Sequence, residues 1–157
     1  MKKVLGIIIA VLLMGLCACK NNCYVPTYGN MGIAFVDSAT LAPVSVKGLT
    51  IKGVGNDSVL YNNATASTAY VPLKQNATET QFEMSFLRGA TDSIASEYVL
   101  TVGSQPYPQL IGPECGCVMF YSIQSVTCHG ATDTLHVEMY HTDVINEAKD
   151  IHVKIYL

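Results

Sequence analysis

One short segment, Pro113-Glu114-Cys115-Gly116-Cys117, has the residue types and spacing that most suggest chemistry, and Cys128 and His129 follow shortly after it. Thiolates and imidazoles bind soft metals, so Cys115, Cys117, Cys128 and His129 are candidates for a metal or thiol site. Structural zinc sites, however, separate paired cysteines by two to four residues, and thiol oxidoreductases by two at a helix start. A single intervening glycine fits neither spacing and favours a disulfide-linked entry into a strand.

Histidines could provide a second kind of site, and the chain has four: His129, His136, His141 and His152. His136 and His152 each alternate with apolar neighbours, so we expect their side chains to point to solvent. If residues 134–140 and 151–157 pair as strands, His136 and His152 become candidates for cross-strand neighbours, and three imidazoles could converge. We interpret the four as exposed strand and turn residues, with no metal and no cofactor.

Motifs typical of enzymes are not found in the sequence. It contains no Gly-x-Ser-x-Gly nucleophile elbow, no Gly-rich phosphate loop before a helix, and its acidic residues are scattered rather than paired. The sequence therefore predicts a protein that is not an enzyme.

A recurring tripeptide combines Asp, a hydroxyl residue and an aliphatic residue. It occurs as Asp37-Ser38-Ala39, Asp57-Ser58-Val59, Asp92-Ser93-Ile94 and Asp133-Thr134-Leu135. It resembles an O-glycosylation sequon of exported Bacteroidota proteins. Asp and Ser also cap turns through side-chain hydrogen bonds to the backbone, and we favour that interpretation.

The N-terminus indicates export. Lys2 and Lys3 precede an apolar stretch, Val4–Leu16, which is shorter than the roughly 20 residues that a spanning helix needs. The segment Leu16-Cys17-Ala18-Cys19 has the apolar and small residues of a bacterial lipobox. The sequence therefore predicts that residues 1–18 are a signal peptide and that Cys19 is the lipid-modified first residue of the mature protein.

A lipid anchor with several chains holds a protein stably on a membrane. The predicted organisation is a lipid anchor and short linker over residues 19–24, then a single β-domain over residues 25–157. No acidic residue follows Cys19 directly, whereas surface-exported lipoproteins of Bacteroidota often carry acids there. The sequence thus slightly favours a cell-envelope location that faces the periplasm over the cell surface.

The composition of the mature chain limits its partners. Removing residues 1–18 from 157 leaves 139 residues, enough for one domain with a core. Loss of two lysines leaves 7 basic against 12 acidic residues, a formal charge of −5, and Arg88 is the one arginine. Nucleic acid is therefore not an expected partner. The expected partners are the membrane, through the anchor, and an envelope protein.

Four cysteines remain once Cys19 carries lipid: Cys23, Cys115, Cys117 and Cys128. An even number of cysteines in an oxidising compartment predicts disulfides, although sequence leaves three pairings open. We favour Cys23 paired with Cys115 or Cys117, because that bridge closes a long loop and restricts the unfolded chain most. Cys128 then pairs with the remaining cysteine or stays free.

The elements that must position these residues are strands. Short β-branched or aromatic segments are bounded by Gly, Asn, Asp or Pro. The predicted strands are Met31–Val36, Val44–Val54 (broken near Gly48), Asp57–Tyr61, Ala69–Leu73, Gln81–Leu87, Ser93–Val102, Cys117–Val126, Thr134–Tyr140 and Ile151–Leu157. About eight or nine strands with no long helix predict an all-β fold, an antiparallel immunoglobulin-like or related β-sandwich, with a small β-barrel as the alternative.

Finer expectations follow from alternation and from proline. Phe82, Met84 and Phe86 should share one buried face, and Tyr98 and Leu100 should point inward. Three prolines in Gly103–Pro113 predict an extended loop, and Asn146–Lys149 predicts a short helical turn.

Four short motifs carry a resemblance to a known group: Cys23-Tyr24-Val25-Pro26 after the lipobox, Ile33-Ala34-Phe35, Val71-Pro72-Leu73 and Glu114-Cys115-Gly116. Together they resemble a group of small Bacteroidota lipoproteins catalogued as a domain of unknown function. The resemblance implies an exported β-domain with a stapling cysteine pair, which suits Cys23 and Cys115, and implies no activity. Cys117 and Cys128 look like departures from that pattern.

Two hypotheses follow. The first is a non-enzymatic, membrane-tethered β-domain that binds a protein or another envelope component or has a structural role. The second is a metal-binding or thiol-active periplasmic protein that uses Cys115, Cys117, Cys128 and His129.

Overall fold

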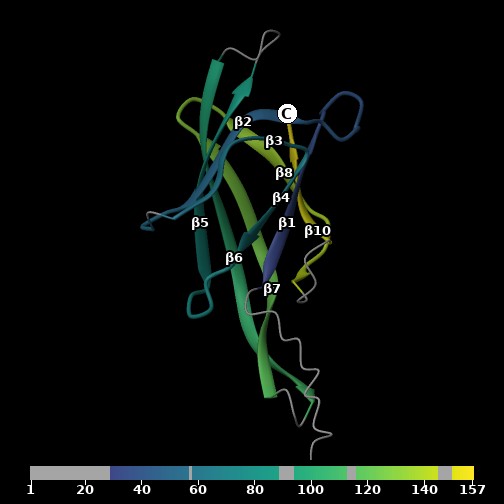
Figure 1. Cartoon of the computed structure of the whole chain (residues 1–157). Coiled ribbons are helices and arrows are strands. Elements are labelled where there is room, and N and C mark those ends of the chain that lie inside the picture. Colours follow the sequence, from purple (N-terminus) through teal and green to yellow (C-terminus); the bar gives the residue numbers. More distant parts are fainter. Residues whose placement is uncertain (1–28, 57, 89–93, 113–115, 145–149) are drawn as a thin grey trace, which may run out of the picture.

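A computed structural model describes residues 29–56, 58–88, 94–112, 116–144 and 150–157, and within these ranges the chain forms strands and turns without a helix (Figure 1). The strands are β1 (Asn30–Val36), β2 (Val46–Gly53), β3 (Val59–Ala66), β4 (Thr68–Pro72), β5 (Glu79–Arg88), β6 (Ile94–Gly112), β7 (Gly116–Gly130), β8 (Thr134–Met139), β9 (Asp143–Val144) and β10 (Ile151–Tyr156). The all-β prediction is confirmed.

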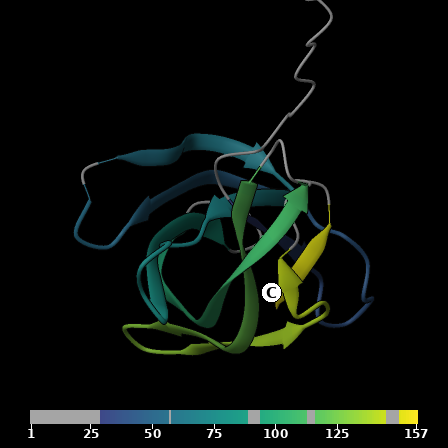
Figure 2. The same ribbon diagram turned by 90° about the horizontal axis from the view of Figure 1, so that it is seen from below.

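The strands form one curled, ten-stranded sheet rather than two separate layers. Their order is β3-β2-β5-β6-β7-β8-β10-β1-β4, and β9 pairs with β7. Because β8 pairs with both β7 and β10, it joins what would otherwise be the two sheets of a sandwich. The predicted sandwich is therefore replaced by its alternative, a nearly closed barrel, which Figure 2 shows from one end.

The two outer strands of this order lie close together in the fold. Ser67 alone separates β3 from β4 in the chain, and the hydroxyl of Tyr61 on β3 accepts a hydrogen bond of 2.8 Å from the backbone N–H of Tyr70 on β4. The barrel is thus nearly closed where β3 and β4 meet. Strand β4 is an edge strand that pairs with β1, a position at which a strand tolerates Pro72.

One neighbouring pair of strands, β1 and β10, is parallel. Hairpins force antiparallel pairing, but strands from opposite ends of a chain carry no such constraint. An entirely antiparallel fold was expected, so this pair is a correction to the sequence-based topology.

The core confirms the predicted alternation. Phe82, Met84 and Phe86 are buried on one face of β5, as are Tyr98 and Leu100 on β6. The ring of Phe86 stacks on that of Tyr98, with centroids 5.4 Å apart. The predicted break near Gly48 is a bulge within a single strand, where the glycine adopts a φ of 66°.

The predicted loop over Gly103–Pro113 is wrong, because β6 continues as a strand to Gly112. Pairing with β5 ends where Glu79 lies opposite Gly103, whereas pairing with β7 continues to the end of β6. Proline is tolerated on strand edges, and Pro106 and Pro108 fall where β6 has lost its β5 neighbour. We call the resulting ribbon, residues 104–112 and 116–123, the arm; β9 pairs with its base at Tyr121 and Ser122, and beyond that point it has two strands. The arm projects at the lower end of Figure 1.

Several sequence predictions concern residues outside those that the structure describes. These are the signal peptide 1–18, Cys19 and the linker 19–24, together with Cys23, Cys115 and the helical turn at 146–149. Among the described residues, no helix has the length and apolar character to cross a membrane.

Candidate functional site

Cys117 and Cys128 lie near opposite ends of β7 and are both free thiols. They are eleven residues apart on one strand, which corresponds to about 36 Å at the usual rise per residue. Their cross-strand partners are likewise distant, since Cys117 faces Leu110 and Cys128 faces Leu100. One metal ion cannot contact both sulfurs, so the four-residue site with Cys115 and His129 does not form.

Cys128 and His129 are adjacent in sequence but lie on opposite faces of β7. Cys128 is fully buried, and desolvation, with a further contribution from Asp133, raises the pKa of its thiol to about 12. A thiol with that pKa stays protonated and unreactive at neutral pH. His129 is exposed, with Nδ1 3.0 Å from Oγ1 of Thr134. No group of three His, Cys, Asp or Glu side chains within the described ranges is placed to hold a metal.

His136 is exposed as predicted, but His152 is not. The side chain of His152 is only 1% exposed, although the alternation of β10 predicted that it faces solvent. The cause is a β-bulge: Gly32 and Ile33 are consecutive on β1, yet their partners on β10 are Ile151 and Val153. The extra residue in a bulge leaves the regular alternation, and here its side chain turns inward.

The buried imidazole of His152 is held by the backbone of β1. Its Nδ1 accepts a hydrogen bond of 2.9 Å from the N–H of Gly32, while Nε2 is buried without a partner. Desolvation lowers the pKa of His152, because burial disfavours the charged imidazolium. Strands β8 and β10 do pair, but His136 lies opposite Tyr156 and not His152, so the predicted imidazole cluster is wrong.

The structure describes the aspartate of two of the four Asp-hydroxyl motifs, Asp37 and Asp133, and both aspartates lie in turns. Oδ1 of Asp37 accepts hydrogen bonds from the N–H groups of Ala39 and Thr40, at 3.0 and 2.7 Å, and from the Thr40 hydroxyl at 2.9 Å. These bonds lower the pKa of Asp37, those of Thr40 most. The second aspartate, Asp133, belongs to the turn between β7 and β8. The capping interpretation therefore holds for Asp37, whereas the side chain of Asp133 bonds Tyr98 and Arg88 instead of the turn backbone.

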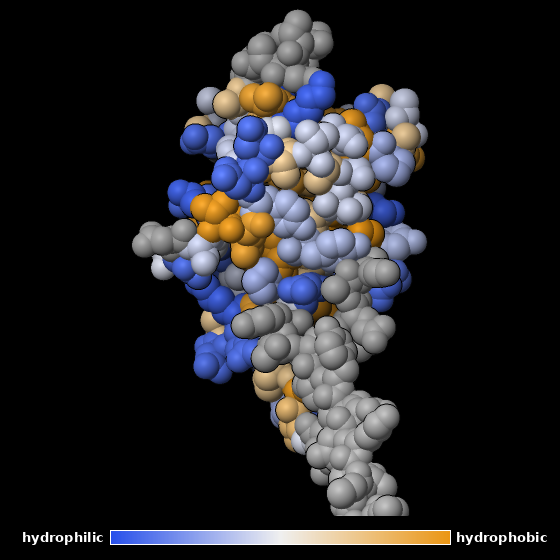
Figure 3. Space-filling view, viewed as in Figure 1, coloured by the Kyte–Doolittle hydropathy of each residue, from blue (hydrophilic) through white to orange (hydrophobic). Residues whose placement is uncertain are grey.

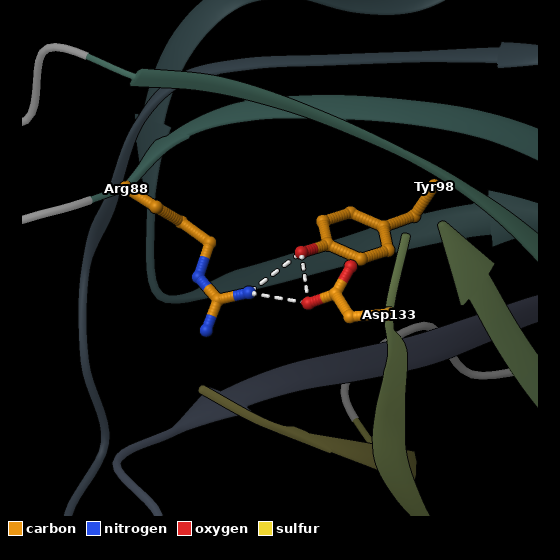
Figure 4. A network of polar contacts seen from close by, with 3 residues as sticks. All are labelled: Arg88, Tyr98 and Asp133. Carbon is orange, nitrogen blue, oxygen red and sulfur yellow. Dashed lines mark hydrogen bonds and ion pairs between the residues drawn. The ribbon is translucent and has the colours of Figure 1, made fainter. Parts of the chain in front are cut away.

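Asp133 joins three elements through a small polar network (Figure 4). The hydroxyl of Tyr98 accepts a hydrogen bond of 2.6 Å from Nη1 of Arg88 and donates one of 3.0 Å to Oδ2 of Asp133. Arg88 also forms an ion pair of 3.2 Å with the same oxygen. The network ties the end of β5 and the β7–β8 turn to β6. Sequence reasoning named Arg88, Tyr98 and Asp133 for separate reasons but missed their contact, because it arises from cross-strand pairing.

A hollow on the outer face of the barrel is the best candidate for a binding site. Two cross-strand rows form it: one of Lys52, Glu83, Val99 and His129 across β2, β5, β6 and β7, and one of Thr50, Ser85 and Glu97 across β2, β5 and β6. We call this hollow the outer groove; its volume is about 810 Å³. In Figure 2 the β2–β3 and β7–β8 hairpins project on the same side of the barrel, to either side of β5 and β6.

The outer groove combines charge, hydroxyl groups and apolar surface. Lys52 and Glu83 form an ion pair of 2.6 Å across two strands, so these charges are largely balanced. Val99, in the same row, is 37% exposed. Such a surface can bind a ligand through hydrogen bonds and apolar contact. Sequence reasoning could not find it, because its members are brought together by cross-strand register.

The fold defines a small all-β barrel protein with a shallow groove on its outer face. The chain belongs to a family of unknown function (DUF6452), whose model matches residues 48–157. No curated protein and no solved structure matches the chain.

Proposed function

We propose that the protein is a membrane-anchored lipoprotein of the cell envelope, of the kind found in Bacteroidota, and that its barrel is a non-enzymatic binding module. The lipobox that ends at Cys19 supports the anchor. The outer groove supports the binding role, and its mixed polar and apolar lining is the observation that carries the proposal. The protein partner or other envelope component binds across β5 and β6.

The anchor can be tested on the full chain in a bacterial host. Cys19→Ala removes the acceptor thiol, so the variant should no longer incorporate labelled palmitate or enter the membrane fraction. Matched Cys17→Ala should retain both properties. A wild-type protein whose intact mass lacks the acyl groups would exclude the anchor. Protease added to whole cells tests the periplasm-facing arrangement, which predicts protection until the outer membrane is permeabilised.

The groove can be tested by site-specific photo-crosslinking in the same host. A photoreactive residue at Val99 should give an adduct of defined mass, whereas the same residue at Leu41, which is 69% exposed in the β1–β2 connection outside the groove, should not. Ser85→Trp, which fills the groove from its floor, should abolish the adduct at position 99. Equal adducts at both positions, or adducts unaffected by Ser85→Trp, would refute the groove as the binding surface.

The envelope location also supports a disulfide between Cys23 and Cys115, formed by exchange with an envelope thiol oxidase. Gly29, the first described residue, lies against the ring of Tyr121 on β7, six residues from Cys115. Cys23 is likewise six residues from Gly29, so the two spans match. Non-reducing peptide mass spectrometry should recover this pair, with Cys117 and Cys128 as free thiols. A Cys23 peptide that carries a free thiol would contradict it.

A further inference from the structure

The arm is built from an unusually uncharged stretch of sequence. Between Glu97 and Asp133, Glu114 is the single Asp, Glu, Lys or Arg, although one residue in eight of the whole chain is of these types (13%). A projecting surface hairpin normally carries charges that keep it in water. The composition of the arm instead suits contact with an apolar or interfacial phase.

One face of the arm continues the core face of the barrel beyond its rim. Ile123 and Tyr121 are buried on this face, Met119 is half-buried, and Cys117 is exposed. On β6 the same face continues to Leu110, which lies opposite Cys117 and is 60% exposed. The apolar pattern of the core therefore extends past the point where the opposite wall of the barrel ends.

The other face of the arm is amphipathic. Gln105 and Gln109 are exposed on it, and between them the half-buried ring of Tyr107 contacts Phe120 edge-on, with centroids 6.0 Å apart. Aromatic rings with polar neighbours are typical of protein segments at the membrane–water interface.

The arm leaves the barrel at the end where β1 begins. Gly29 lies at the base of the arm, where its Cα approaches the ring of Tyr121 so closely that a Cβ would meet it at 2.5 Å. Figure 1 shows β1 beginning at the end of the barrel from which the arm projects, and Figure 3, in the same view, shows apolar atoms there. Ten residues separate Cys19 from Gly29, a tether of at most about 35 Å.

The lengths agree with a membrane contact. From Gly103 to Gly112 the arm advances about 30 Å. A lipid at Cys19 would therefore hold the base of the arm no farther from the bilayer than roughly the arm's own length.

We propose that the arm contacts the surface of the bilayer, with Leu110 and its neighbours on the core-side face entering the interfacial layer of a neutral membrane. This inference rests on the lipid anchor proposed above. The absence of Lys and Arg from the arm means that anionic headgroups are not its target. The contact is interfacial rather than spanning, because a two-stranded ribbon has edge backbone groups that must stay hydrated.

The chain lacks tryptophan, so a single introduced tryptophan reports its own surroundings. Leu110→Trp places the reporter at the end of the arm, and Leu41→Trp places it at an exposed leucine in the β1–β2 connection, at the other end of the barrel. Both full-length lipidated proteins are reconstituted into phosphatidylcholine vesicles with brominated acyl chains. We expect the emission of Leu110→Trp to shift to the blue and to be quenched by bromine, and that of Leu41→Trp to stay unquenched.

Other outcomes would overturn the inference. A blue-shifted Leu110→Trp without bromine quenching would mean that a second copy or the chain's own N-terminal segment covers the face. Emission typical of water at both positions would mean that the arm stays in solution. If the wild type carries no lipid, the anchor fails instead. The intact mass of each reconstituted protein therefore separates failure of the proposed function from failure of the membrane contact.

Discussion

Strands β6 and β7 pass through two environments, the barrel body and the arm. In the body they carry Leu100 and Cys128, both fully buried. In the arm the same two strands carry Leu110, which is 60% exposed, and Cys117, which is exposed. The two strands stay paired through both parts, and each part alternates regularly on either side of a register shift at Gly103 and Ser104. Burial is therefore set by what lies across from a strand, and a strand pattern alone does not specify it.

The largest expected effect contrasts two leucines on β6. Leu100→Ala should lower the free energy of unfolding by about 2–5 kcal/mol, because it leaves a cavity in the closed core. Leu110→Ala should change it by less than about 0.5 kcal/mol, because the side chain is largely exposed. Urea unfolding of both variants measures the difference. Similar losses for both variants would mean that the arm is packed as tightly as the body.

The two free cysteines of β7 provide the next contrast. Cys128→Ser places a hydroxyl in the core without a hydrogen-bonding partner and should cost about 1–3 kcal/mol, whereas Cys117→Ser should be nearly neutral. In the native wild type at neutral pH, a maleimide should label Cys117, while Cys128 should react only on unfolding. Native labelling at Cys128 would show that this part of the body opens.

Tyrosine hydroxyls give a smaller contrast. Tyr98→Phe removes the hydroxyl that bridges Arg88 and Asp133 but leaves their ion pair, so the loss should be about 1–1.5 kcal/mol. In the arm, Tyr107→Phe keeps the ring contact with Phe120 and should stay within about 0.5 kcal/mol of the wild type. Thermal unfolding of the two variants under one condition checks this. A neutral Tyr98→Phe would show that the ion pair alone holds the turn.

The sequence predicted most of the strands because their signal is local. Alternation identified the buried face of β5 and the inward side chains of β6 without knowledge of any partner strand. Gly48 marked a real irregularity, since its positive φ favours glycine. Each of these predictions needed only residues that are close in the chain.

The failures depend on partners distant in sequence. Prolines indicated a loop at residues 103–113, and only the loss of the β5 neighbour explains why a strand accepts them. His152 was expected in solvent, but a bulge against β1, 120 positions away from it at Gly32, turns it inward. The outer groove and the link through β8 that makes a barrel also arise from cross-strand pairing, which one sequence does not reveal.

The smallest predicted effect concerns His152, a buried residue of the barrel body. It is compared with His136, which is exposed. Burial lowers the pKa of the His152 imidazole below the ordinary histidine value of about 6.5, so the unfolded chain binds a proton first as pH falls. Stability from this group is complete above about pH 6.5 and declines towards the lowered pKa, by at most about 1.4 kcal/mol per pH unit. Protonation of Nδ1 would also break its hydrogen bond from Gly32.

Two asparagine variants isolate this contribution. His152→Asn retains an acceptor for the Gly32 N–H but does not titrate, so its unfolding free energy should fall less than that of the wild type between pH 7 and pH 5.5. His136 is exposed on β8, and His136→Asn should retain the wild-type slope. Urea unfolding across this range compares the slopes, which do not depend on any packing loss that His152→Asn causes at every pH. If His136→Asn flattened the profile and His152→Asn did not, the acid sensitivity would belong to the surface rather than to the bulge between β1 and β10.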